Sequence, residues 1–292
     1  MTKKRKDPTI EQLAELMNEL AAYYHRTIVI KIGGNSIAED EHFLSKIAKQ
    51  IKFLRANGVR VVLIHGGGPQ IDHALRDKNI EITKGADGRR ITSPKAMKVV
   101  RSVMNEVNRE VVQALVDEGC AKDKILCAAR HPRHFVQAEP LDPDDESNRS
   151  GRPSAVADHE LNRFLEKGRI IVLHSVGLGH DGKTFYNING DDYAMAVAIA
   201  LGAKRLIMVT NVPGVLDKRR KRIPSLDQEM ADELIGSGVI SGGMVPKVES
   251  ALWVVKQGVG GVAIIDGFTP WAILAEMLTH EGFGTIVQSQ MG

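Results

Sequence analysis

A lysine followed by two glycines is the feature of this sequence that most clearly indicates chemistry. The stretch TIVIKIGGN, residues 27–35, places Lys31 inside an apolar run and Gly33 and Gly34 directly after that run. Burying an ammonium group is costly unless an opposite charge offsets it, and glycine lets a backbone N–H approach an anion closely. We therefore expect Lys31 to project from the end of a strand toward a phosphate group. On this stretch alone, a lysine at a sheet edge facing water is an equal alternative.

Three further glycine turns follow predicted strands. They are HGGGPQ with Gly66, Gly67 and Gly68, the turn where Gly190 precedes Asp191, and NVPGVLD with Gly214. Ligands of open α/β sheets lie beyond the carboxyl ends of the strands, and the next helix N-terminus favours negative charge. Four such turns predict a large, highly charged ligand. The dinucleotide fingerprint and the P-loop pattern are absent from these turns, which argues against a nicotinamide enzyme and a Walker-type ATPase.

Three other charged residues could belong to a site for an anionic ligand, two as cations and one as a carboxylate that positions lysines. Lys247 stands at a predicted helix start, where the helix macrodipole disfavours a cation unless an anion offsets it. Asp191 opens another helix, where it could act as an N-cap, as an organiser of two lysines, or as both. Arg90, in DGRRITS, could bind a carboxylate as a fork or could be a surface arginine.

Alternating apolar strands and amphipathic helices must position these residues. The apolar runs predict strands over 28–32, 59–64, 170–176, 206–210 and 262–265, and helices lie between them, including a long one capped by Ser93. This alternation favours a mainly parallel sheet with helices on both faces. Thr9 and Gln12 form a capping box for an additional N-terminal helix with one apolar stripe. The polar stretch 130–155, rich in Pro and Asp, predicts a long loop with at most a short strand.

The composition excludes several classes of protein. The 292 residues carry a net charge of +3 and are 43% hydrophobic, and no apolar run reaches the ~18–20 residues that span a bilayer. The N-terminus has no apolar signal core, so we expect a cytoplasmic protein that does not bind membranes. Two basic clusters, at 3–6 and 218–222, lack interleaved aromatic residues and are read as solvated, so nucleic-acid binding is not favoured.

Seven ordered blocks resemble the amino acid kinase family. They are IVIKIGGN, VVLIHGGGPQ, GRRITSPKAMKVV, YNINGDDYA, LIMVTNVPGVLD, ISGGMVPKVESAL and EGFGTIV. The resemblance covers nearly the whole chain from residue 27 onward. The combination of HGGGPQ with an NIN-small-D block looks most like the N-acetyl-L-glutamate kinase branch of that family.

The resemblance implies a fold and a reaction. The expected fold is a three-layer α/β/α sandwich with a mainly parallel central sheet and two lobes: an N-terminal helical extension over 1–26, an amino-acid-binding lobe over 27–201 and a nucleotide-binding lobe over 202–292. The expected reaction moves the γ-phosphoryl group of ATP to the side-chain carboxylate of N-acetyl-L-glutamate. The Mg²⁺ ion would be carried by the nucleotide, and no metal ligand is expected from the protein.

The resemblance also assigns residues. Lys31 and Lys247 would neutralise the transferring phosphoryl group, and Asp191 would hold both lysines. Nucleotide or phosphate binding is assigned to Gly33, Gly34, Thr210, Asn211, Gly214, Gly242, Gly243 and Met244, and acyl amino acid binding to Gly66, Gly67, Gly68, Arg90, Asn187 and Asn189. Phosphoryl transfer requires positioning and charge neutralisation, and an ionised carboxylate needs no general base.

Several segments depart from the pattern of that branch. Asn211 stands where the family usually has Asp, and the stretches CAARHPRHFVQAE, NRSGRPS and HSVG replace family motifs on the amino-acid side of the site. The acceptor is therefore open: the same chemistry on another acyl amino acid or carboxylate, or a catalytically weak sensor of nucleotide or amino acid, are alternatives. The N-terminal helix predicts a homo-oligomer, either a dimer or a hexamer joined by that helix. Arginine inhibition stays open: Trp271 replaces a histidine common in the arginine-inhibited subgroup, whereas Glu276 and the stretch GFGT remain.

Overall fold

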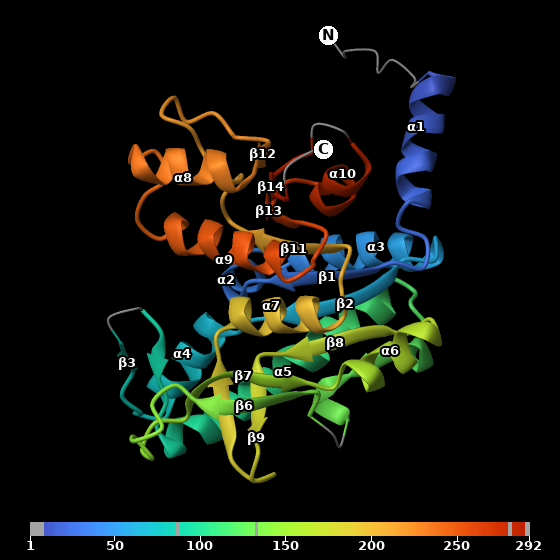
Figure 1. The fold of residues 1–292 in the computed structure, drawn as a ribbon. Coiled ribbons are helices and arrows are strands. Elements are labelled where there is room, and N and C mark those ends of the chain that lie inside the picture. Colours follow the sequence, from blue (N-terminus) through green and yellow to red (C-terminus); the bar gives the residue numbers. More distant parts are fainter. Residues whose placement is uncertain (1–8, 86–87, 132–133, 280–281, 290–292) are drawn as a thin grey trace.

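A central eight-stranded sheet lies between two layers of helices (Figure 1). The computed structural model describes residues 9–85, 88–131, 134–279 and 282–289. The strand order is β12-β14-β13-β11-β1-β2-β8-β5, and every neighbouring pair is parallel except β13 and β14. The bounds are β1 Thr27–Ile32, β2 Arg60–His65, β5 Ile125–Cys127, β8 Ile170–His174, β11 Arg205–Thr210, β12 Ser225–Leu226, β13 Val262–Asp266 and β14 Thr285–Val287. The predicted fold class is confirmed.

Each face of the sheet carries its own apolar core, because successive strand residues point to opposite faces. Val29 of β1 joins the core under α6 (Asp158–Glu166), α7 (Gly190–Ala200), α8 (Gln228–Gly236) and α9 (Met244–Lys256). Ile28 and Ile30 join the core under α3 (Phe43–Ala56), α5 (Pro94–Asp117) and α10 (Ala272–Leu278). Burial on both faces explains why the strands read as continuous apolar runs. Within the described residues, no helix is both long and apolar enough to cross a membrane.

The sheet divides between the two halves of the chain. Strands β1, β2, β8 and β5 come from residues 27–201, and β11, β13, β14 and β12 come from residues 202–292. The two halves meet where β1 pairs with β11, so Lys31 lies opposite Met208 at the centre of the sheet. The predicted lobe boundaries stay a prediction.

The expectation of a long loop over 130–155 is wrong. This stretch contributes β6 (Val136–Pro140) and β7 (Ser150–Val156), which form a closed four-stranded barrel with β9 (Val176–Gly179) and β10 (Phe185–Ile188). The barrel strands are half exposed, so their sequences keep polar residues and proline and lack the apolar run of a buried strand. This half also contains α4 (Gly68–Asp77), η1 (Lys122–Lys124), η2 (Ala128–Arg130) and the strands β3 (Thr83–Lys84) and β4 (Arg90–Ile91).

The N-terminal helix α1 (Ile10–Ala21) stands at the edge of the molecule (Figure 1). Its capping box is confirmed, because the Thr9 hydroxyl accepts from the Gln12 N–H and the Gln12 side chain accepts from the Thr9 N–H. None of its residues is buried, and Ile10 and Met17 are 82% and 71% exposed. The stripe is therefore exposed over its first two turns in the single chain, whereas Leu20 at its end packs against the core that α10 covers. The basic cluster at 3–6 lies outside the described residues.

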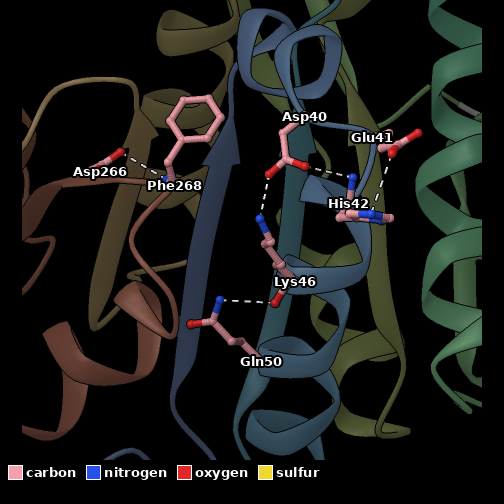
Figure 2. Close-up of polar contacts among 7 residues, drawn as sticks. All are labelled: Asp40, Glu41, His42, Lys46, Gln50, Asp266 and Phe268. Atoms are coloured by element: carbon pink, nitrogen blue, oxygen red, sulfur yellow. Dashed lines mark hydrogen bonds and ion pairs between the residues drawn. The ribbon is translucent and has the colours of Figure 1, made fainter. Parts of the chain in front are cut away.

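Helix α3 follows the first glycine turn and α2 in the chain, and it contacts α10 through hydrogen bonds of Gln50. The glycine turn opens α2 (Gly34–Glu39), and the corner after α2 is fixed by Asp40, which pairs with Lys46 at 2.7 Å and accepts from the His42 N–H (Figure 2). One turn further along α3, the buried Gln50 donates to the Lys46 carbonyl. Its Oε1 accepts from the N–H groups of Ile273 and Leu274, at the buried start of α10. Gln50 therefore supplies acceptors that the first turn of α10 lacks.

Replacing Gln50 tests this connection. Gln50→Leu leaves the two N–H groups of α10 buried without an acceptor, so we expect the free energy of unfolding to fall by about 1–3 kcal/mol. Urea denaturation measures it. The matched control is Gln113→Leu, because Gln113 is exposed and bonds only along its own helix to Asp117. An equal loss in both variants would show that Gln50 has no special role.

Candidate functional site

Two glycine turns meet at the carboxyl ends of β1 and β2. A Cβ atom on Gly34 would lie 2.8 Å from the backbone N of Gly68 and 2.9 Å from Cα of Gly67. Such distances are below any ordinary contact with backbone, so position 34 accepts only glycine without moving the second turn. Gln70 holds the two turns together, since its Nε2 donates to the Gly34 carbonyl at 3.1 Å. The close approach brings the backbones of the two turns into contact.

A cavity of about 320 Å³ lies beside these turns. Its floor is formed by the glycine turns, and its walls come from the β3–β4 hairpin (Thr83–Lys84 and Arg90–Ile91), the small barrel and the start of α7. We call it the first cavity. It gathers most residues that the sequence assigns to the acyl amino acid and to the phosphate, namely Lys31, Gly33, Gly34, Gly66, Gly67, Gly68, Arg90, Asn187, Asn189 and Asp191.

An ion pair joins Lys31 and Asp191 inside this cavity. The Lys31 Nζ lies 2.7 Å from Asp191 Oδ1, and the two side chains are 15% and 25% exposed. Asp191 is not the N-cap of α7: Asn189 takes that position, and its Oδ1 accepts from the Asp191 N–H at 2.7 Å. The cap on Asn189 leaves the Asp191 carboxylate to face the lysine.

The Asp191 carboxylate stays ionised despite its burial. Burial favours the neutral form, but the charges of Lys31, then Lys247, then Arg89 outweigh it and hold the pKa of Asp191 below its ordinary value. A permanent negative charge thus stands among these cations at neutral pH. Such an arrangement can hold cations close together before an anionic ligand arrives.

A second cavity of about 480 Å³ opens between α7, α9 and strands β11 and β13. Apolar side chains line much of it, among them Met195, Met208 and Ile264. Thr210, Gly243 and Lys247 line it as well, and Lys247 lies in the first turn of α9, as predicted. Arg89, Asn189 and Asp191 line both cavities, so the two spaces meet at the start of α7.

Four of the residues assigned to the nucleotide line neither cavity: Asn211, Gly214, Gly242 and Met244. Gly214 has a φ of +126°, and a Cβ there would lie 2.6 Å from the Thr285 hydroxyl, so its glycine is required by packing. Asn211 and Gly242 are exposed nearby, and Met244 packs against the core under α9. Their contact with a nucleotide stays a prediction.

Sequence reasoning missed the polar network that fixes Arg90. The Arg90 guanidinium forms an ion pair with Asp72 of α4. Its backbone carbonyl accepts from the Ser150 hydroxyl, which in turn accepts from the Thr92 N–H. The Thr92 hydroxyl accepts from Asn187 Nδ2 at 3.0 Å. The network could not be predicted from the sequence, because Ser150 and Asn187 lie 58 and 95 residues from Thr92 along the chain. The only sign of it was that the stretch NRSGRPS, which contains Ser150, departs from the family pattern.

Two buried histidines lie beneath the glycine turns. The rings of His65 and His174 are 6.3 Å apart, and burial lowers their pKa values to about 4 and about 3. Asn108 bonds to His65 at 3.0 Å and accepts from the Cys127 thiol. His174 Nδ1 has no hydrogen-bond partner among the described residues. Both histidines are therefore neutral and structural at pH 7.

Comparisons with known sequences match the chain over most of its length. A family model described as the amino acid kinase family matches residues 26–266. The acetylglutamate kinase of Methylobacterium nodulans is 37% identical over 291 residues, covering 95% of this chain and 93% of that protein. The acetylglutamate kinase of Mesorhizobium japonicum is 38% identical over 297 residues, covering 96% of this chain and 97% of that protein.

Solved structures show the same fold. The protein smu.665 of Streptococcus mutans is 32% identical with a TM-score of 0.72, covering 90% of this chain and 99% of that one. The N-acetylglutamate synthase of Neisseria gonorrhoeae, solved with coenzyme A and N-acetyl-glutamate, has a TM-score of 0.82 at 22% identity. This chain is covered to 98% but spans only 65% of the length of that synthase, so the likeness shows the fold alone.

The buried histidines generate a pH prediction. Folding lowers both pKa values from 6.5, so the unfolded chain binds more protons below pH 6.5, and the free energy of unfolding falls as the pH drops from 6.5 toward 4. His174→Leu should reduce this slope by about 1.4 kcal/mol per pH unit. Urea denaturation across pH 4.5–7.5 measures it. The control is His73→Leu, since His73 is 77% exposed; an unchanged slope in His174→Leu would contradict the assignment.

Proposed function

Because the chain belongs to the amino acid kinase family, we propose that it transfers the γ-phosphoryl group of ATP to the side-chain carboxylate of N-acetyl-L-glutamate. The product is N-acetyl-L-glutamyl 5-phosphate, an intermediate of arginine and ornithine biosynthesis. The observation that carries this proposal is the junction at Asp191. A cavity lined by glycine turns and a more apolar cavity meet at one carboxylate, and each contributes one lysine.

We assign the first cavity to the acyl amino acid and the second to the nucleotide. Arg90, fixed by Asp72 and Ser150, would bind a carboxylate of the acceptor. Asn187 and Asn189, which line the same cavity, would form hydrogen bonds to the acceptor beside it. The apolar wall of the second cavity suits a nucleobase. The phosphoryl group would then cross the junction between Lys31 and Lys247.

Phosphoryl transfer requires little covalent chemistry from the protein. The attacking carboxylate is ionised at neutral pH, so no base must remove a proton from it. Charge develops on the oxygens of the transferring group, and preorganised cations and backbone N–H groups stabilise it. Asp191 keeps the two ammonium groups in place between turnovers. The glycine turns at Gly34 and Gly67 would bring backbone N–H groups to the same oxygens.

Mg²⁺ fits as a partner of the nucleotide. Within the described residues, no group of three or more His, Cys, Asp or Glu side chains is placed to hold a metal ion. We propose that the ion enters on the nucleotide phosphates, where it offsets their negative charge. The residues of this chain then act on the phosphoryl oxygens that the ion does not cover.

An enzyme assay tests the reaction and the acceptor together. Release of ADP is followed with MgATP and N-acetyl-L-glutamate, and hydroxylamine traps the acyl phosphate as a hydroxamate. Lys31→Ala should lower kcat about 10²–10³-fold, because it removes one preorganised donor. The control is Lys98→Ala, an exposed lysine of α5, which should keep full activity.

The outcomes separate the alternatives. No turnover with N-acetyl-L-glutamate but turnover with another acylated or free dicarboxylic amino acid would mean the same chemistry on a different acceptor, set by the divergent walls at 148–151 and 174–177. Nucleotide binding with no turnover on any of them would favour a sensor. Full activity of Lys31→Ala would contradict the assigned mechanism.

We also propose that α1 joins copies of this chain. Its stripe leaves Leu13 and Met17 47% and 71% exposed in the single chain. A cavity of about 260 Å³ near α1 and α10 is lined by Glu19, Tyr23 and Glu276. Whether arginine inhibits the protein stays open.

Light scattering coupled to gel filtration tests the oligomer. The wild-type protein should form a hexamer, and the double variant Leu13→Glu, Met17→Glu should form dimers, because two charges replace the apolar contact. Glu15→Gln, which leaves the stripe intact, is the control. A wild-type dimer, or a double variant that stays hexameric, would exclude α1 as the joining element.

A further inference from the structure

We propose that Arg89 is a third cation of the phosphoryl-transfer site, positioned by Asp192 and in contact with the phosphoryl group as it crosses the junction. This inference rests on the proposed function and deepens it. The resemblance assigns roles to Lys31, Lys247 and Asp191, and none to Arg89 or Asp192. The structure places both at the same junction.

Arg89 lies where the two cavities meet. Arg89 precedes strand β4 on the hairpin that covers the first cavity, and its side chain lines both the first and the second cavity. Among the described residues, this property is shared only with Asn189 and Asp191. A group that moves from the nucleotide to the acceptor must pass the residues common to both spaces. Arg89 is the cation among these three.

An ion pair holds the guanidinium there. Arg89 Nη1 lies 2.7 Å from Asp192 Oδ2, and the side chains are 34% and 24% exposed. A guanidinium carries five N–H donors in a planar fork, so it can bind a carboxylate and a phosphate at the same time. Asp192 thus restricts the long side chain to one side of the junction before the phosphoryl group arrives.

The start of α7 gives Lys31 and Arg89 a carboxylate each. Asp191 and Asp192 are consecutive in the first turn of α7, where the helix macrodipole favours both negative charges. Consecutive helix residues point about 100° apart, so the two carboxylates face different directions. Asp191 pairs with Lys31 and Asp192 pairs with Arg89. The same device that positions the predicted catalytic lysine is repeated one residue later.

The charges at the junction favour an incoming anion. Lys31, Lys247 and Arg89 all act on the Asp191 carboxylate and lower its pKa. With Asp192, the junction carries three cations against two carboxylates. The net charge of these five side chains is positive, and a transferring phosphoryl group spreads negative charge over its oxygens. A third cation therefore acts at the point where that charge develops.

A rival interpretation is that the pair only ties the β3–β4 hairpin to α7. The two interpretations differ in the single variant Asp192→Asn. If the pair only links the hairpin to α7, Asp192→Asn breaks that link as fully as Arg89→Gln does, and the two single variants are equally slow. If Arg89 acts on the phosphoryl group, Asp192→Asn keeps the guanidinium and loses less activity than Arg89→Gln, and the double variant is as slow as Arg89→Gln.

The experiment measures kcat and KM for N-acetyl-L-glutamate in Arg89→Gln, Arg89→Lys, Asp192→Asn and the double variant. We expect Arg89→Gln and the double variant to lose about 10²-fold in kcat, with KM changed much less. Arg89→Lys should fall between them and the wild type, because lysine keeps the charge without the fork. Arg76→Gln, an exposed arginine of α4 outside both cavities, is the control and should keep full activity.

A binding measurement separates catalysis from folding. Calorimetry with MgADP, aluminium fluoride and N-acetyl-L-glutamate should show that Arg89→Gln weakens binding of this transition-state mimic about 10²-fold, while MgATP alone binds nearly as before. An Arg89→Gln kcat within twofold of wild type, or an Asp192→Asn kcat as low as that of Arg89→Gln, would overturn the inference and leave the proposed function standing. A wild-type protein without turnover would overturn both.

Discussion

The ion pair between Lys31 and Asp191 is the interaction on which the rest of the site depends. Lysines from two halves of the chain must stand near one point without an anion to separate them, and their repulsion would drive them apart. Asp191 supplies the missing charge, and the charges around it keep its carboxylate ionised. The site is thereby charged and arranged before any substrate binds, which is what phosphoryl transfer requires of a protein.

The scaffold serves this arrangement through backbone geometry. β1 lies at the centre of the sheet, between β2 and β11, so Lys31 projects where the two halves of the chain meet. The approach of Gly34 to the second glycine turn leaves room only for backbone. Asn189 takes over the capping of α7 and leaves the next acidic residues to pair with cations. Packing and capping thus place charges that would be unfavourable elsewhere.

The sequence predicts those parts that depend on local or strongly periodic signals. Buried parallel strands, the capping box at Thr9 and the glycine turns are written in neighbouring residues, and each is confirmed. The strands over 136–140 and 150–156 were missed because a half-exposed barrel lacks an apolar run. The network from Arg90 through Ser150 to Asn187, and the pair of Arg89 with Asp192, join residues far apart in the chain. No spacing rule reveals such contacts before the fold is known.

A crystal structure of the protein with MgADP, aluminium fluoride and N-acetyl-L-glutamate tests the central claim most directly. The claim is that the phosphoryl group crosses the junction at Asp191. The account predicts that the fluoride complex lies between the two cavities, with the Nζ atoms of Lys31 and Lys247 both within about 3 Å of it. A complex seated away from Asp191, or one that only a single lysine reaches, would contradict the account.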